Sequence, residues 1–181
     1  YDDAKNFKVM RLEKDGFQNI NNWEEVIEVR DTHYIEDMLT FNEFIVIQSR
    51  YDGIPIIEVF NFANNSLNQI DMKDEVYDLG LVYNNDFDSS FFRYSYSSLK
   101  TSPQILKYDL YQNINNVIWK KQVNNFIDTD YEIKRIKTLV RDDTNVPVSI
   151  VYKKGLDLKN APMLIYGYGS YGINMDSGFR S

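Results

Sequence analysis

The chain has 181 residues and a formal net charge of -7, and its hydrophobic fraction of 43% is sufficient for a globular core. The acidic charge argues against a nucleic-acid partner, which calls for a clustered basic surface, and no apolar run approaches the roughly 20 residues of a membrane-spanning helix. The chain has no cysteine, which excludes disulfides and thiolate metal sites, and we expect a cytoplasmic protein.

Aromatic residues make up 15% of the chain, and only 4 prolines occur. Together with abundant asparagine, this composition favours strands joined by polar turns, so a mainly β protein is expected. The first predicted strand covers residues 7–12, where apolar and polar side chains alternate, and its partner covers residues 26–29. Asp15-Gly16 lies between them and predicts a turn, because glycine accepts a positive φ.

Two consecutive groups of four short strands follow, separated by turn residues. The first group is predicted at residues 34–39, 44–49, 55–60 and 67–70, and the second at residues 79–83, 91–97, 105–110 and 117–121. Phe44 and Phe91 lie 47 residues apart in corresponding strands, which fits the roughly 40 to 50 residues of a four-stranded propeller blade. The run Phe44-Ile45-Val46-Ile47 is apolar on both faces, as a strand between two blades would be. These patterns predict two whole blades and part of a third, and a β-sandwich fits them almost as well.

The chain changes character after residue 124. Longer strands are predicted at residues 131–141 and 146–152, joined by Asp142-Asp143-Thr144-Asn145, where Asp and Asn tolerate left-handed conformations. A short apolar run opened by Pro162 then predicts a buried strand, which enters a tight loop containing Gly167, Gly169 and Gly172.

The spacing of these glycines also matches the Gly-x-Gly-x-x-Gly fingerprint of dinucleotide-binding proteins. That motif needs a helix beginning at the loop, small residues facing the pyrophosphate and an acidic residue about 20 positions later. Residues 173–178 make a poor helix start, Tyr168 and Tyr171 would crowd a phosphate, and the sequence ends before the position of that acidic residue. No cofactor is therefore expected.

Residues 162–172 resemble the loop after an early strand of the α/β-hydrolase domain in the prolyl oligopeptidase family of serine peptidases. The ending Gly169-Ser170-Tyr171-Gly172 is most similar to the oligopeptidase B branch, whereas the prolyl-specific branch has Gly-Gly-Phe. Further segments resemble the same branch in the same order, and they are Asn6-Phe7-Lys8-Val9, Asn22-Trp23, Phe44-Ile45-Val46, residues 93–99 with Pro103, Tyr108-Asp109-Leu110, and residues 146–152. The resemblance extends over nearly the whole chain.

This resemblance implies a seven-bladed propeller followed by an α/β-hydrolase domain, with the chain as a fragment across their junction. We place the boundary near Asp130, so that residues 1–130 are the C-terminal part of the propeller and residues 131–181 the first strands of the catalytic domain. Relatives usually have Asp-Gly where this chain has Asp142-Asp143, which leaves the turn type open. Blades taken from a ring expose apolar faces, so we expect the fragment to self-associate.

By resemblance, the whole enzyme hydrolyses short peptides after Arg or Lys, and its propeller excludes folded proteins. Tyr168 matches the tyrosine whose hydroxyl forms half of the oxyanion hole, and Tyr171 matches an aromatic position near the S1 pocket; turn packing is the alternative role for both. The family's catalytic triad comes later than this loop, and the chain has no Gly-x-Ser-x-Gly elbow, so it should be inactive alone. Cleavage after proline and a propeller that only binds proteins are the alternative functions.

His33 is the only histidine, and it lies in the propeller-like half beside a predicted strand. A catalytic triad needs a histidine base within about 3 Å of a nucleophile, so we interpret His33 as an ordinary surface or turn residue. One histidine with scattered carboxylates has no metal-ligand spacing, and no metal site is expected.

Overall fold

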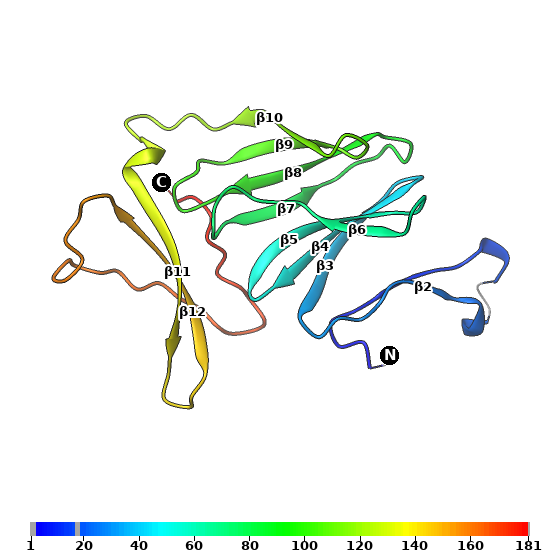
Figure 1. Ribbon diagram of the computed structural model, residues 1–181, viewed down its shortest axis with the longest axis horizontal. Coiled ribbons are helices and arrows are strands. Elements are labelled where there is room, and N and C mark those ends of the chain that lie inside the picture. Colours follow the sequence, from blue (N-terminus) through cyan, green and yellow to red (C-terminus); the bar gives the residue numbers. More distant parts are fainter. Residues whose placement is uncertain (1–2, 17–18, 181) are drawn as a thin grey trace.

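The computed structural model describes residues 3–16 and 19–180, whose strands form four antiparallel sheets (Figure 1). Two four-stranded sheets lie at the centre, and a two-stranded sheet lies toward each end of the chain. The only helical turns in the described ranges are short 3-10 segments at Lys14–Gly16, Ile20–Asn22 and Asp128–Asp130. The prediction of a mainly β chain is confirmed, and none of the described helical segments is long and apolar enough to cross a membrane.

The first four-stranded sheet is a meander in the order β3-β4-β5-β6, as predicted. Its strands cover His33–Thr40, Phe44–Tyr51, Ile54–Asn61 and Ser66–Gln69. Tyr51 pairs with Ile54, so only Asp52 and Gly53 connect β4 to β5, with φ values of 47° and 76°. Two central residues with positive φ are typical of a type I′ turn, which explains an Asp-Gly pair at this position.

The second four-stranded sheet repeats this meander with β7, β8, β9 and β10. Its strands cover Asp78–Val82, Phe91–Ser97, Gln104–Asp109 and Ile114–Lys120. Phe44 and Phe91 are each the first residue of the second strand in their sheet, so the predicted repeat is confirmed in the backbone. β10 is the outer edge of this sheet and is exposed along its whole length.

The two-stranded sheet near the N-terminus contains β1 (Val9–Arg11) and β2 (Glu24–Ile27) and is the predicted part of a third blade. The predicted turn at Asp15-Gly16 is present as the 3-10 turn Lys14–Gly16, where the N–H of Gly16 donates to the carbonyl of Glu13 at 2.8 Å, but Gly16 does not have the expected positive φ. Arg11 pairs with Glu24, so a connection of twelve residues separates the strands, and Gly16 ends the first 3-10 turn within it. A connection of that length is folded by several local turns and cannot be a two-residue hairpin loop.

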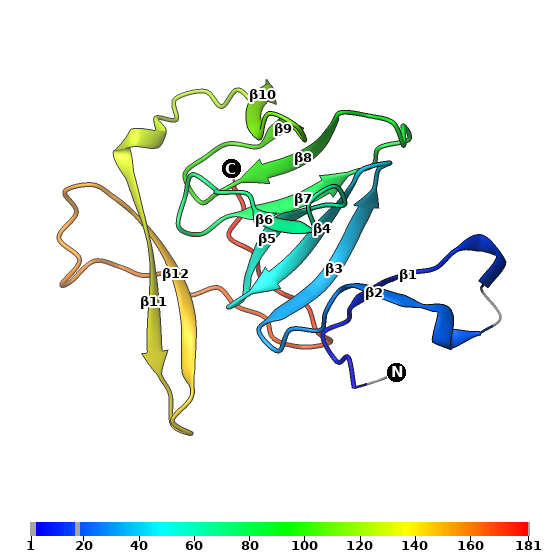
Figure 2. The ribbon, with the colours of Figure 1, turned by 45° about the vertical axis from the view of Figure 1, so that its right-hand side comes forward.

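Two hydrophobic cores hold these sheets together, one on each face of β4. Phe44 and Val46 belong to the larger core, which also contains buried side chains of the β7–β10 sheet. Ile45 and Ile47 belong to the smaller core, which contains buried side chains of β1 and β2. Figure 2 shows the β3–β6 sheet between its two neighbours. The prediction that this run is buried on both faces is therefore confirmed.

β11 (Tyr131–Leu139) and β12 (Asn145–Lys153) form a long hairpin beside the blades (Figure 1). The pairing is regular from Tyr131 opposite Lys153 to Leu139 opposite Asn145. In its turn Asp143 has a φ of 61°, which is the left-handed conformation that aspartate tolerates.

Residues 154–180 contain no strand, so the predicted buried strand after Pro162 is wrong. Met163, Leu164 and Ile165 are 78%, 91% and 80% exposed. A buried strand needs a neighbouring strand to accept and donate its backbone hydrogen bonds and other side chains to cover it, and the described residues supply neither.

Candidate functional site

The glycine loop, residues 166–172, is an open segment at the surface. Tyr168 is 50% exposed and Tyr171 is 91% exposed. A Cβ added at Gly167 or Gly169 would have no neighbouring atom within 4 Å, so no described part of the chain packs closely against the loop at these positions. Both tyrosines are therefore accessible to another molecule or domain.

The backbone turns sharply at the end of this loop. Tyr171 and Gly172 have φ values of 56° and 68°, and the N–H of Ile173 donates to the carbonyl of Ser170 at 3.1 Å. No helix begins in residues 173–180. The dinucleotide-binding motif requires a helix whose N-terminus faces the pyrophosphate, so the loop lacks the element that would bind one.

The tyrosine hydroxyls of the blades and those of the glycine loop differ in their hydrogen bonding. In the blades, the Tyr94 hydroxyl donates to Asn115 at 2.9 Å and the Tyr96 hydroxyl donates to Asp74 at 3.0 Å, while burial raises the pKa of both phenols. Among the described residues, no group is hydrogen-bonded to the hydroxyl of Tyr168 or Tyr171. A free phenol is a hydrogen-bond donor that can serve a ligand.

His33 lies at the start of β3, far along the chain from the glycine loop. Its ring stacks on Tyr51 with 4.8 Å between centroids, and its Nδ1 is 2.9 Å from the hydroxyl of the adjacent Thr32. Burial and, to a smaller extent, the charge of Arg30 lower the pKa of His33, so the ring is neutral at neutral pH. The structure gives His33 packing contacts, in agreement with the interpretation of an ordinary residue.

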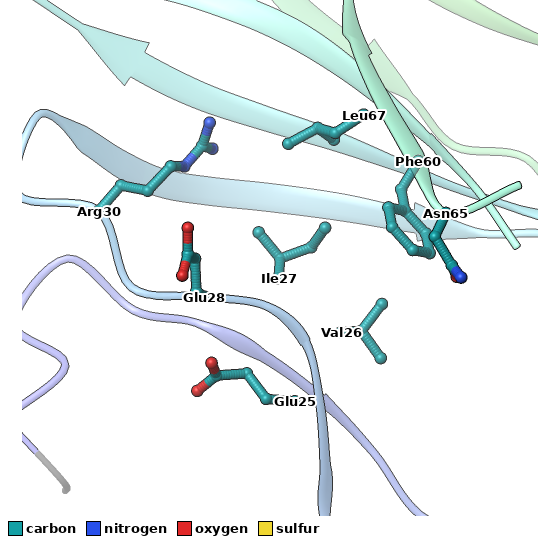
Figure 3. A pocket seen from close by; sticks show the side chains of 8 residues that line it. All are labelled: Glu25, Val26, Ile27, Glu28, Arg30, Phe60, Asn65 and Leu67. Atoms are coloured by element: carbon teal, nitrogen blue, oxygen red, sulfur yellow. The ribbon is translucent and has the colours of Figure 1, made fainter.

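A groove of about 360 Å³ lies between β2 and the pair β5 and β6 (Figure 3). It is lined by Glu25, Val26, Ile27, Glu28, Arg30, Phe60, Asn65 and Leu67. Arg30 is already engaged, because it donates two hydrogen bonds of 2.7 Å to the carboxylate of Glu58. Burial favours neutral Glu58, but the bonds from Arg30 and Ser49 outweigh burial and lower its pKa. The lining residues include no nucleophile or histidine, so the groove is a packing seam between sheets.

No group of three His, Asp or Glu side chains in residues 3–16 and 19–180 is arranged to hold a metal ion. The roles that the family resemblance implies for Tyr168 and Tyr171 of the glycine loop stay predictions.

A cluster around Arg50, near the end of β4, joins three parts of the chain. Its Nε donates to Glu36 on β3 at 2.8 Å, and its Nη1 donates to the carbonyl of Gly53 at 3.0 Å. Nη1 and Nη2 also donate to the carboxylate of Asp176, at 2.6 and 3.0 Å. Burial alone lowers the pKa of Arg50, and the bonds to Asp176 and Glu36 outweigh burial and raise it.

A second contact joins the same end of the blade to the β11–β12 hairpin. Arg135 on β11 donates to the carbonyl of Asp52, and the Nζ of Lys137 lies 3.2 Å from the carboxylate of Asp52. Neither contact is predictable from the sequence, because no local pattern marks residues that lie so far apart along the chain; Arg50 and Asp176 are 126 positions apart.

The sequence of the chain matches a known protein family. Residues 1–122 match the family model of the prolyl oligopeptidase N-terminal beta-propeller domain. Dipeptidyl aminopeptidase BI of Pseudoxanthomonas mexicana is 28% identical over 180 residues, which are 98% of this chain and 25% of the relative. Protease 2 of Moraxella lacunata is 26% identical over 178 residues, 97% of this chain and 25% of the relative. The chain thus spans about a quarter of the length of these relatives.

Solved structures agree with this assignment. The closed form of oligopeptidase B from Trypanosoma brucei matches with a TM-score of 0.87 and 27% identity, over 99% of this chain and 26% of that one. Oligopeptidase B from Leishmania major has the same TM-score at 23% identity, over 98% of this chain and 26% of that one, and supports the fold. These matches exclude the β-sandwich alternative and identify the two meanders as propeller blades. The chain belongs to the prolyl oligopeptidase family, and it carries part of that family's N-terminal β-propeller.

Proposed function

We propose that the protein is a serine oligopeptidase that hydrolyses short peptides after Arg or Lys. The observation that carries this proposal is the place of the glycine loop: residues 166–172 follow two propeller blades and a hairpin in a chain that resembles oligopeptidase B over 99% of its length. On this proposal residues 1–130 are the end of the propeller, and residues 131–181 are the first part of the catalytic domain.

Within this proposal, the two tyrosines of the loop have separate roles. The Tyr168 hydroxyl, which has no hydrogen-bond partner among the described residues, donates to the oxyanion that forms on the scissile carbonyl. The second donor is a backbone N–H beside the catalytic serine. Tyr171, with its ring almost fully exposed, lies near the S1 pocket and contacts the residue that precedes the cleaved bond. Open positions at Gly167 and Gly169 leave room for the substrate.

The blades restrict access to this site, so that short peptides enter and folded proteins do not. The proposed location is the cytoplasm, which suits a chain without cysteine, and fractionation of cells that produce the protein tests it.

The experiment that tests the function measures hydrolysis by the full-length protein of matched peptides with Arg, Lys or Pro before the scissile bond. We expect kcat/KM for Arg and Lys to exceed that for Pro by at least about 10²-fold, since a site built for a charged group rejects one that leaves it unpaired. A preference for proline would favour the prolyl alternative. Release of dipeptides from the N-terminus would match the name of the Pseudoxanthomonas relative, and no hydrolysis at all would favour a binding module.

The 181-residue chain alone is proposed to be inactive, because its sequence contains no Gly-x-Ser-x-Gly elbow and its one histidine is packed on Tyr51. Turnover of an arginyl amide by the purified chain that disappears in His33→Ala would contradict this.

The isolated chain is also proposed to self-associate through apolar side chains of the outer blade. Ile114, Val117, Ile118 and Trp119 on the edge strand β10 are about half exposed. Sedimentation at several concentrations tests this, and a monomer throughout would contradict it.

A further inference from the structure

We propose that Arg50 of the propeller is a positioning residue for the glycine loop. By holding Asp176, it fixes residues 176–180, and these residues fix Tyr166 at the beginning of the loop. The inference rests on the function proposed above. It gives the propeller a part in building the active site, in addition to limiting which substrates reach it.

The first link is the pair of hydrogen bonds between Arg50 and Asp176. A guanidinium that faces a carboxylate with two parallel N–H groups fixes its orientation as well as its distance. The side chains are 11% and 26% exposed, so water screens them less than it screens a surface pair. The guanidinium also donates hydrogen bonds to Glu36 and to the carbonyl of Gly53, and these bonds fix its orientation relative to β4.

The second link is the close approach of residues 178 and 179 to the blade β7–β10. A Cβ at Gly178 would lie 3.0 Å from a carboxylate oxygen of Asp78 and 3.3 Å from the hydroxyl of Ser97, so a side chain at this position would push the segment away. The N–H of Phe179 donates to the same Ser97 hydroxyl at 3.3 Å. The segment therefore rests against both blades.

The third link returns the chain to the loop. The ring of Phe179 packs edge-on against the ring of Phe126 with 4.9 Å between centroids, which holds residue 179 by its side chain as well as its backbone. The guanidinium of Arg180 then lies 4.7 Å from the centroid of the Tyr166 ring, a cation–π contact. Tyr166 is two residues before Tyr168. A displacement of Asp176 is thus transmitted along a short, held segment to the oxyanion donor.

The test compares Arg50→Ala, Arg50→Lys and Asp176→Ala in the full-length protein. We expect kcat on an arginyl amide to fall by about 10-fold or more in each alanine variant with little change in KM, because a small misplacement of a catalytic donor lowers kcat steeply. Arg50→Lys should remain impaired, since an ammonium cannot make the paired contact. The double alanine variant should match the worse single one.

A double-mutant cycle of Arg50→Ala and Tyr168→Phe distinguishes a positioning role of Arg50 from general destabilisation of the fold. In the wild-type background Tyr168→Phe should cost about 10²-fold in kcat, and in the Arg50→Ala background less than about 10-fold, because the hydroxyl is already misplaced. Arg30→Ala is the matched control: it removes another paired arginine, on Glu58, which has no link to the loop. It should leave the Tyr168→Phe factor at its wild-type value. An equal factor in the Arg50→Ala and wild-type backgrounds would overturn the proposal.

Hydrogen exchange gives a readout that does not depend on activity. In Arg50→Ala and Asp176→Ala, the amide of Phe179, which donates to Ser97, should exchange at least about 10-fold faster while β11 and β12 are unchanged. If Tyr168→Phe has no effect on kcat in any background, Tyr168 is not an oxyanion donor. Hydrogen exchange alone then tests whether Arg50 anchors residues 176–180. Unchanged exchange of the Phe179 amide would overturn the anchor whatever the activity shows.

Discussion

Two apolar runs in this chain have similar sequences and opposite environments. Residues 44–47, Phe-Ile-Val-Ile, form the start of β4 and are at most 5% exposed, whereas Met163, Leu164 and Ile165 form no strand and are at least 78% exposed. β4 has β3 and β5 as hydrogen-bonded neighbours and a hydrophobic core on each face. Strand propensity is thus common to both runs, and burial depends on neighbours that only the first run has.

The same contrast extends to the polar groups. In the blades, buried polar side chains have partners within the sheets, such as Glu58 with Arg30 and Ser49. The glycine loop, residues 166–172, is open, and the hydroxyls of Tyr168 and Tyr171 have no hydrogen-bond partner among the described residues. The polar groups buried in the blades are therefore paired within the blades, whereas the loop is an open surface that another part of the protein or a ligand can contact.

The largest expected effect is a loss of stability when a buried side chain of the first run, residues 44–47, is truncated. Ile47→Ala in the purified chain should lower the free energy of unfolding by about 4 kcal/mol, because Ile47 is fully buried and its removal leaves a cavity between sheets. Leu164→Ala is the matched control and should change it by less than about 0.5 kcal/mol. Urea denaturation measures both, and a comparable loss in the two variants would show that residues 163–165 are covered in solution.

The next effect is a loss of kcat in the full-length protein when a tyrosine of the open glycine loop is changed. Tyr168→Phe should lower kcat by about 10²- to 10³-fold, or roughly 3 to 4 kcal/mol in the activation free energy, because one oxyanion donor is lost. The hydroxyl gives more to the transition state than to the ground state, so KM should change little. Tyr166→Phe should retain kcat, since only its ring contacts Arg180. Equal losses in both variants would assign Tyr168 to packing.

Much of the propeller was predictable because its signals are local. Alternating side chains and Asp-Gly or Asn-Asn turns placed all ten blade strands to within a few residues, and the 47-residue offset of Phe44 and Phe91 identified the repeat. The strand after Pro162 was not predictable in the same way, since its burial depends on strands far from it in sequence. The turn at Asp15-Gly16 was predictable from the dipeptide, but the length of the connection between β1 and β2 was not, because a dipeptide does not set that length.

The candidate site was predictable only in part. The glycines located a turn, and Tyr168 and Tyr171 lie in an accessible loop, but their roles came from family resemblance and stay predictions. Arg50 and Asp176 carried no sequence signal, because an arginine on a strand and an aspartate in a loop are ordinary until the fold brings them together.

A smaller effect concerns Asp74, a buried carboxylate in the connection between β6 and β7. Asp74 accepts hydrogen bonds from Tyr96 at 3.0 Å and Thr101 at 2.7 Å. Burial raises the pKa of Asp74, but bonds from Ser98, Thr101 and Tyr96 outweigh it and lower the pKa below 3.8. A lowered pKa contributes stability above the ordinary value that is lost as the pH falls through the folded-state value.

Asp74→Asn should therefore destabilise the chain by about 2 kcal/mol at pH 7, where charge-assisted hydrogen bonds are lost. The difference from wild type should be constant down to about pH 5 and shrink below about pH 4. Unfolding in urea at several pH values measures it, with the exposed Asp71→Asn of the same connection as control. A difference that grows toward low pH would contradict the assignment.

The smallest effect lies where the two regions meet, at Asp78 on β7. Burial and the charges of Asp176 and Glu36 raise the pKa of Asp78, while Arg50 and the N–H of Leu79 lower it, and the net shift is upward. A raised pKa contributes stability that is complete below the ordinary value of 3.8 and is lost as the pH rises through the folded-state value. Ionised Asp78 therefore weakens the junction at neutral pH.

Asp78→Asn should accordingly stabilise the purified chain at pH 7 by up to about 1 kcal/mol, a small effect because the group is half-exposed and screened. At pH 3 the aspartate is protonated, so variant and wild type should unfold at the same urea concentration. Glu36→Gln is the control of opposite sign: it weakens bonds from both Arg50 and Gln48 and should destabilise at pH 7. If Asp78→Asn lowers stability at pH 7, the carboxylate helps to hold the junction, and residues 176–180 depend on more than Arg50.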